Sequence, residues 1–230
     1  MEALLAFGAA LLALRFAGDL ARRFSIRRTP ELAAWSASLV AYALASGALA
    51  WGSAAGWNEA AFRVYYACGG LLTAPLLGVG SLLLVGRRWA APLGLVYAGL
   101  AVGVSTAEPL VGRVGGASIP EAQAHLDLFP ARLLAIVGNS AGTLAVVAVA
   151  VATFRRRPLA SALIVAGMTV AAGGSAVAGL GVARTAAFVA LAVVLLYAGF
   201  RTASGAPGKT AELSSRRVLT RLRSGARLRG

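Results

Sequence analysis

The sequence is short of the residues on which most catalytic and metal chemistry depends. Its 230 residues include one Cys (Cys68), one His (His125) and one Lys (Lys209). A single Cys cannot form a disulfide within the chain, and one Cys with one His cannot make a Cys/His zinc site. We therefore expect no metal ion and no cofactor.

Charged residues are also scarce, and they are unbalanced. Only 13% of the residues are charged, whereas 59% are hydrophobic, and 22 Lys and Arg face 8 Asp and Glu. The mean hydropathy is +0.77. A soluble domain cannot bury that much apolar surface, so most of the chain is predicted to lie in lipid.

Seven apolar stretches come close to the ~20 residues that a helix needs to cross a hydrocarbon core. They lie near 3–21, 32–54, 61–85, 90–107, 130–153, 159–180 and 184–201. The fold class predicted is an all-α membrane protein, a seven-transmembrane-helix bundle formed by residues 1–201. Residues 202–230 are then a basic tail, either an amphipathic helix or a disordered arm.

The basic residues predict the orientation of this bundle. Seventeen Lys and Arg follow the first, third, fifth and seventh spans, against four on the other side: Arg63, Arg113, Arg132 and Arg184. The positive-inside rule places the richer side in the cytoplasm. The amino end is therefore expected outside and the carboxyl end inside, in a bacterial inner (plasma) membrane.

The pentapeptide GNSAG, residues 138–142, fits two different patterns. As G-x-S-x-G it has the form of a hydrolase nucleophile elbow, which needs a strand, a sharp turn and a base. Nothing predicts a strand, and the only imidazole, His125, lies in a connection outside the membrane. As G-x-x-x-G it is a helix contact face. We expect the second reading and no enzyme activity.

Polar residues near the outer starts of the third, fifth and seventh spans are the candidate ligand site. Guanidinium groups at helix amino ends favour a carboxylate, phosphate or sulfate. The alternative is that each Arg extends to lipid headgroups or pairs with a nearby acid, such as Glu59, Glu121 or Asp127. The predicted ligand-binding residues are Arg63, Arg132, Arg184, Glu108, Tyr66, Asn139 and Ser140.

Other segments carry more limited expectations. Arg15 and Asp19, one helical turn apart, are predicted to neutralise each other. Pro75 is expected to kink the third span. In the long connection 107–129, the segment PEAQAHLDLF is predicted to form a short surface helix.

The basic tail is predicted to contact anionic lipid through Arg216, Arg217, Arg221 and Arg223. A protein partner is the alternative for this tail. Nucleic acid is not expected, because no aromatic residues that would stack on bases alternate with the arginines.

Two segments, FRVYYACGGLLTAPLLGVGSLLLVGRR and RLLAIVGNSAGTLAVVAVAVATFRRRP, resemble multi-span membrane proteins of actinomycete-type bacteria to which no activity is assigned. The resemblance implies the fold but no functional residues. The seven-span layout also looks like that of microbial rhodopsins, but the seventh span has no Lys for a retinal Schiff base.

These observations predict a non-enzymatic membrane component that senses, binds or scaffolds, with an outward-facing polar pocket. A small transporter or permease subunit is the alternative, and a membrane-embedded enzyme is a third. A polar path from the outer arginines to the cytoplasm would favour transport, whereas a closed, apolar inner half would favour sensing or scaffolding.

Overall fold

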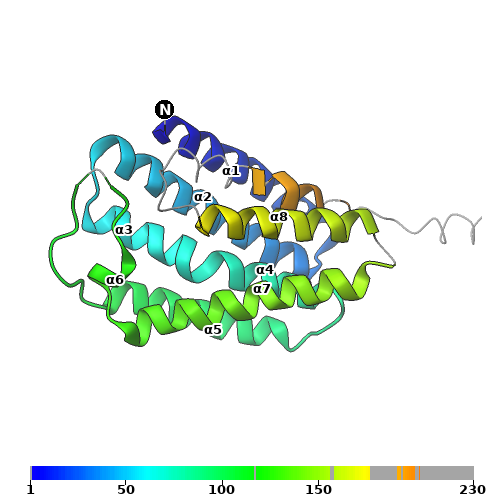
Figure 1. Ribbon diagram of the computed structural model, residues 1–230. Coiled ribbons are helices and arrows are strands. Elements are labelled where there is room, and N and C mark those ends of the chain that lie inside the picture. Colours follow the sequence, from blue (N-terminus) through cyan, green and yellow to red (C-terminus); the bar gives the residue numbers. More distant parts are fainter. Residues whose placement is uncertain are drawn as a thin grey trace, which may run out of the picture.

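The computed structural model describes residues 2–116, 118–155, 158–176, 191–192, 194–199 and 202. All regular structure in these residues is helical. Figure 1 shows the long helices aligned side by side as a bundle. They are α1 (Glu2–Arg27), α2 (Pro30–Ala55), α3 (Glu59–Tyr65), α4 (Thr73–Leu84), α5 (Ala90–Ala107), α6 (Ala122–His125), α7 (Leu133–Thr153) and α8 (Pro158–Ala176). Two π-helical segments, η1 (Tyr66–Leu72) and η2 (Leu128–Arg132), complete this set.

Five helices are long and apolar enough to cross a membrane, and they coincide with the first five predicted spans. The third joins α3, η1 and α4 into one helix, and the fifth joins η2 and α7. Each of these has 26 residues, and the fifth is interrupted near its start by the non-helical backbone of Phe129. At about 1.5 Å per residue, both are long enough for a hydrocarbon core of ~30 Å. The sixth predicted span begins in α8. Of the seventh, residues 191–192 and 194–199 are helical, and the rest lies outside the described residues.

The surface of the bundle supports a lipid environment. Large apolar side chains point outward along several helices, including Leu4, Leu95, Val96 and Leu144, which are 63–76% exposed. Small residues face inward instead. Ala6, Ala9, Ala13 and Ala17 are buried at three- to four-residue spacing on α1, which packs along α2. Small side chains let helix backbones approach closely where lipid gives no hydrophobic drive between helices.

The prediction that Arg15 neutralises Asp19 is wrong. Asp19 instead pairs with Arg23, whose Nε lies 3.6 Å from Asp19 Oδ2, and it accepts a hydrogen bond from the Tyr197 hydroxyl. The Tyr197 ring stacks on Phe16 with centroids 3.8 Å apart. Arg15 is exposed. Asp19 therefore faces the last described helical segment, which only tertiary packing brings to α1.

GNSAG lies inside α7, and its two glycines form the contact face that G-x-x-x-G predicts. A Cβ on Gly142 would overlap the backbone of Ala74 and Pro75 in α4, and one on Gly138 would overlap the Tyr97 hydroxyl in α5. A Cβ on Gly78 would in turn meet Gly142. The helix-contact reading is confirmed, because only residues without a side chain fit at this crossing.

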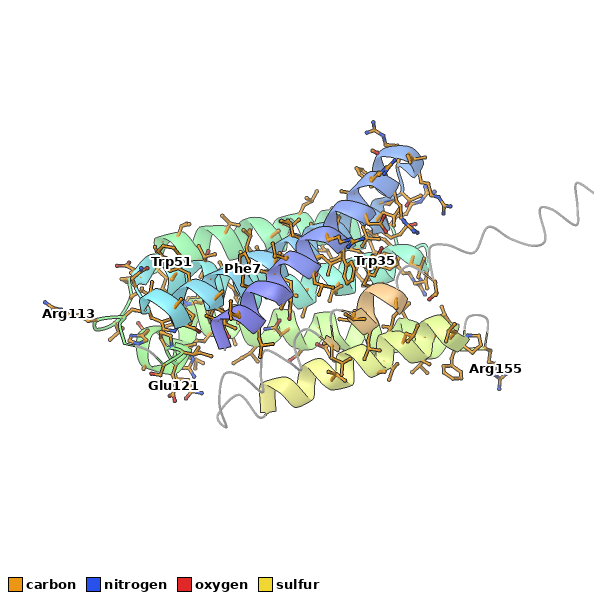
Figure 2. All side chains as sticks on the ribbon, turned by 90° about the horizontal axis from the view of Figure 1, so that it is seen from above. Phe7, Trp35, Trp51, Arg113, Glu121 and Arg155 are labelled. Atoms are coloured by element: carbon orange, nitrogen blue, oxygen red, sulfur yellow. The ribbon has the colours of Figure 1, made fainter. Side chains whose placement is uncertain are left out.

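The connections divide the bundle into two ends. Figure 2 shows Arg113 and Glu121 at one end and Arg155 at the other. We call the first the loop end, because it carries the turn 56–58 and the connection 108–127, and the second the arginine end. The described arginines of the predicted cytoplasmic group lie at the arginine end, in the last turns of α1 or after α1, α4 and α7: Arg22, Arg23, Arg27, Arg28, Arg87, Arg88 and Arg155.

The helix predicted in the long connection is shorter than expected. Ala122–His125 is an α-helix of four residues, and the backbone angles of Leu126 and of Phe129, near the start of η2, are extended. Leu126 turns inward and is 6% exposed, whereas Phe129 is 75% exposed. The two side chains therefore do not share one face of a surface helix, because the helix ends at His125, before either residue.

Candidate functional site

The connection 108–127 forms an ordered cap over the loop end. The Trp57 amide donates to Gly116 O at 2.9 Å, and the Val111 amide donates to His125 O at 2.9 Å. His125 Nδ1 lies 3.1 Å from Val111 O, and its ring meets the edge of Phe62 at a centroid distance of 5.6 Å. A buried cluster beneath the cap joins it to α1, α2 and α3.

Glu108 is the acid that fastens this cap to the fifth span. It directly follows α5, is 8% exposed, and its Oε2 accepts the Ala131 amide at 3.0 Å. Oε1 is buried without a hydrogen-bond partner among the described residues. Burial raises the pKa of Glu108 and the charge of Asp127 adds to the rise, whereas the backbone amides of Ala131 and Asp127 and the charge of Arg63 oppose it.

Arg63 is held in place by two helices. Its Nε and Nη2 donate to Glu59 Oε1 at 3.0 and 2.9 Å, and its Nη1 donates to Ser105 O at 2.8 Å. Glu59 is one turn earlier in α3, and its side chain is 63% exposed. The pairing of an outer Arg with a nearby acid, the alternative considered for the arginines, is therefore confirmed for Arg63.

A cavity of about 470 Å³ opens beside Arg63 at the loop end. It is lined by Glu59, Arg63, Pro109, Leu110, Gly112, Arg113 and Val114. Arg113 is exposed, and no carboxylate of the described residues lies within 4 Å of it. Sequence reasoning missed Arg113 as a site residue, since it belongs to no helix and its position depends on how the cap folds.

The other predicted site residues occupy different places. Arg132 does not line the cavity, although Tyr66 interacts electrostatically with both Arg132 and Glu108. Asn139 is half-buried and Ser140 is exposed on α7. Arg184 and the tail residues Arg216, Arg217, Arg221 and Arg223 lie outside the described residues.

Asn139 belongs to a set of hydrogen bonds around Pro75, deep in the bundle. Proline has no N–H, so Pro75 cannot donate to the carbonyl four or five residues back, which belongs to Leu71 or Gly70. Those are the two carbonyls that other helices reach. Asn139 Nδ2 donates to Gly70 O at 2.7 Å, and the Tyr97 hydroxyl lies 3.0 Å from Leu71 O.

Two further side chains complete this set, which we call the Pro75 node. Thr73 Oγ1 donates to Cys68 O at 2.7 Å, and Ser38 Oγ donates to Thr73 O at 2.7 Å. The Gly70 and Leu71 carbonyls both lie in η1, where the helix widens to a π-helix. Asn139 is therefore used to satisfy backbone groups, and the structure does not bring it or Ser140 to the loop-end cavity.

Comparison of the chain with protein-family models, with curated proteins and with solved structures found no match. The resemblance to actinomycete membrane proteins stays a prediction. What can be said of function rests on the chemistry of the loop end.

Glu108 yields a prediction about pH. Because its pKa is raised in the folded protein, the folded state holds this proton over a pH range in which the unfolded chain has lost it. Stability from this group is present at low pH and is lost as the pH rises through that range. E108Q, which stays neutral, should therefore melt at a higher temperature than wild type at about pH 7.5, and the two should converge at about pH 4.5.

E108A serves as the contrasting variant, because it leaves the Ala131 amide without its acceptor. It should lower the free energy of unfolding by about 1–3 kcal/mol at both pH values. Melting curves in detergent across this pH range provide the measurement. A wild-type protein that gains stability relative to E108Q on raising the pH would contradict the assignment.

GNSAG gives a second prediction, from two adjacent residues. N139L removes the donor to the Gly70 carbonyl, which neither water nor lipid can replace in the bundle interior. It should cost about 1–2 kcal/mol of stability. S140L places the same side chain on the exposed side of α7 and should be close to neutral. Equal melting temperatures for the two variants would show that the Asn139 hydrogen bond is dispensable.

Proposed function

We propose that this protein is a non-enzymatic multi-span membrane protein that binds a small amphipathic anion at the loop end. The observation that carries the proposal is the cavity of about 470 Å³ beside Arg63 and Arg113. Guanidinium groups bind carboxylate and phosphate oxygens with charge-assisted hydrogen bonds. Pro109, Leu110 and Val114 on the same wall favour a ligand with an apolar part.

The two arginines differ in a way that suits binding. Arg63 is oriented by Ser105 O and Glu59, so part of the positive charge is fixed before any ligand arrives. Arg113 is exposed and has no carboxylate within 4 Å among the described residues, so its donors are available. Glu59 is the one acid in the cavity wall, and its exposed side chain is free to turn toward solvent when an anion takes its place.

The interior of the described bundle favours binding over transport. Its polar side chains, such as Ser38, Tyr97 and Asn139, donate to backbone carbonyls. A transport path needs polar groups along a continuous route through the membrane, whereas these three side chains form hydrogen bonds with the helix backbone. A small transporter or permease subunit remains the alternative function.

The proposal includes an orientation and a span count. Seven spans, an outer amino end and a cytoplasmic tail agree with the described arginines after α1, α4 and α7, which lie at the same end. The loop end then faces outward in a bacterial plasma membrane, where it meets ligands from outside the cell. Lipid contact by the tail is part of the same proposal.

Binding is tested with octyl phosphate and octanoate, with uncharged octanol as the reference ligand. R113Q should weaken binding of both anions about 10- to 100-fold, because a hydrogen bond to a charged group is worth about 1.5–3 kcal/mol. R63Q/R113Q should abolish it, whereas octanol should bind all proteins alike. Affinities can be measured by thermal shift or calorimetry in detergent.

R15Q is the matched control, since it removes one exposed guanidinium from α1 and leaves the cavity intact. It should bind as wild type does. If R113Q binds both anions with wild-type affinity, the cavity is not the binding site.

Orientation is tested by cysteine accessibility, because Cys68 is the only native thiol. In a C68S background, S118C places a thiol at the exposed loop end and S25C places one at the arginine end. A membrane-impermeant maleimide added to intact cells should label S118C, and should label S25C only after lysis. The reverse pattern would place the amino end inside.

A further inference from the structure

A second cavity, of about 210 Å³, lies between α4, α5 and α7 and does not touch the loop-end site. Its wall is almost entirely apolar and includes Pro75, Val79, Leu93, Tyr97, Val137 and Ala141. Leu93, Val137 and Ala141 are exposed on the outer surface of the bundle. The cavity is thus a groove on the membrane-facing side, which we call the α5 groove.

Glycines keep the neighbouring helices close around this groove. Gly78 of α4 meets Gly142 of α7, and a Cβ on Gly94 of α5 would lie 2.9 Å from Val79. All three glycines line the cavity. The floor is therefore made of tightly packed backbone, while larger side chains form the rims, a shape that suits a narrow flexible chain.

The groove begins at the arginine end. Trp89 and Ala90 line its mouth, and Arg87 and Arg88 directly precede them. The turn is fixed by the Ala90 amide, which donates to Arg87 O at 3.1 Å. Tryptophan is the residue most typical of the membrane interface, so this turn is placed where lipid headgroups lie.

The two arginines at the mouth carry uncompensated charge. Both are exposed, and the ion pairs of the described residues are Arg23 with Asp19 and Arg63 with Glu59. Arg87 and Arg88 therefore have no described carboxylate within 4 Å. They present two positive charges beside an apolar groove, the arrangement that complements a lipid with an anionic headgroup.

The length of the groove matches one leaflet. Trp89 and Tyr97 are eight residues apart on α5, about 12 Å along the helix at 1.5 Å per residue. One leaflet contributes about 15 Å of hydrocarbon. At the deep end, the Tyr97 hydroxyl is held by Leu71 O and Leu134 O, so the Pro75 node closes the groove near the middle of the bundle.

We propose that the α5 groove binds one acyl chain of an anionic glycerophospholipid, with the lipid phosphate on Arg87 and Arg88. The apolar wall accommodates the chain, and the arginines distinguish an anionic headgroup from a zwitterionic one. This proposal does not depend on which end of the protein faces the cytoplasm, because the mouth of the groove and the two arginines lie at the same end. It is independent of anion binding at Arg63 and Arg113.

The test uses the full-length protein in phosphatidylcholine vesicles that contain a trace of photoactivatable lipid. The probe is phosphatidylglycerol with a diazirine on one acyl chain, and phosphatidylcholine with the same chain is the reference. Mass spectrometry locates the labelled residues. We expect labelling at Leu93, Val137 and Ala141, several-fold stronger with phosphatidylglycerol than with phosphatidylcholine.

Two pairs of variants separate the chain from the headgroup. A141F fills the groove and should reduce labelling of Leu93 and Val137 several-fold. S140F adds the same ring at an exposed position of α7 that does not line the groove, about 100° around the helix from Ala141, and should not. R87Q/R88Q should lower phosphatidylglycerol labelling to the phosphatidylcholine level. R27Q/R28Q removes two charges elsewhere at the arginine end and should preserve the difference.

Three results would overturn the proposal. Equal labelling by both lipids in the wild-type protein would mean that the groove is filled by bulk lipid. Full labelling of Leu93 and Val137 in A141F would place the chain elsewhere. A headgroup preference that survives R87Q/R88Q would remove the arginines from the site. A141L, a smaller change at the same position, replaces A141F if the latter does not fold.

Discussion

A proline inside a membrane helix leaves backbone carbonyls that lipid cannot satisfy, and the described bundle is arranged around that requirement. Without water in the hydrocarbon core, each unpaired carbonyl costs several kcal/mol. Pro75 lacks the N–H that would bond to the carbonyl of Gly70 or Leu71. The third span has a π-helical segment at this point, and both carbonyls accept hydrogen bonds from other helices. Asn139 and Tyr97 thereby fix α7 and α5 against that span, and the small residues at their crossings let the backbones come near enough to do so.

The same requirement explains where ligand chemistry can occur. Ser38, Tyr97 and Asn139 in the described interior donate to backbone carbonyls, whereas the charged groups that could meet a ligand lie at the two ends. At the loop end, Arg63 is partly neutralised by Glu59, and Arg113 is added by the folded cap. At the arginine end, Arg87 and Arg88 have no described acid beside them and adjoin an apolar groove. We propose a small amphipathic anion as the ligand of the first end and a lipid as the ligand of the second.

Predictions from the sequence were confirmed where they depend on residues close together in the chain. They were wrong or incomplete where a side chain interacts with a residue far along the chain. The first five spans were predictable because an apolar run long enough to cross a membrane can be recognised without reference to other parts of the chain. Asp19 was assigned the wrong arginine, because Arg15 and Arg23 are equally spaced from it and the Tyr197 hydroxyl lies 178 residues away. Arg113 was missed because a connection has no periodicity from which to read its direction. Arg63 and Glu108 were found, but their roles as a paired cation and a buried cap acceptor needed coordinates.

Composition and the spacing of apolar residues determine by themselves that the described part of this chain forms helices of membrane length, with most of its arginines near the helix ends. These properties can be read from each segment separately, because they depend on residues close together in the sequence. Tertiary structure alone decided what individual polar residues do. Asn139 and Ser140 are adjacent in GNSAG and about 100° apart on a helix, yet one bonds to the third span and the other is exposed. That difference depends on how α7 is rotated against α4, which the close contact of Gly142 with Ala74 and Pro75 fixes.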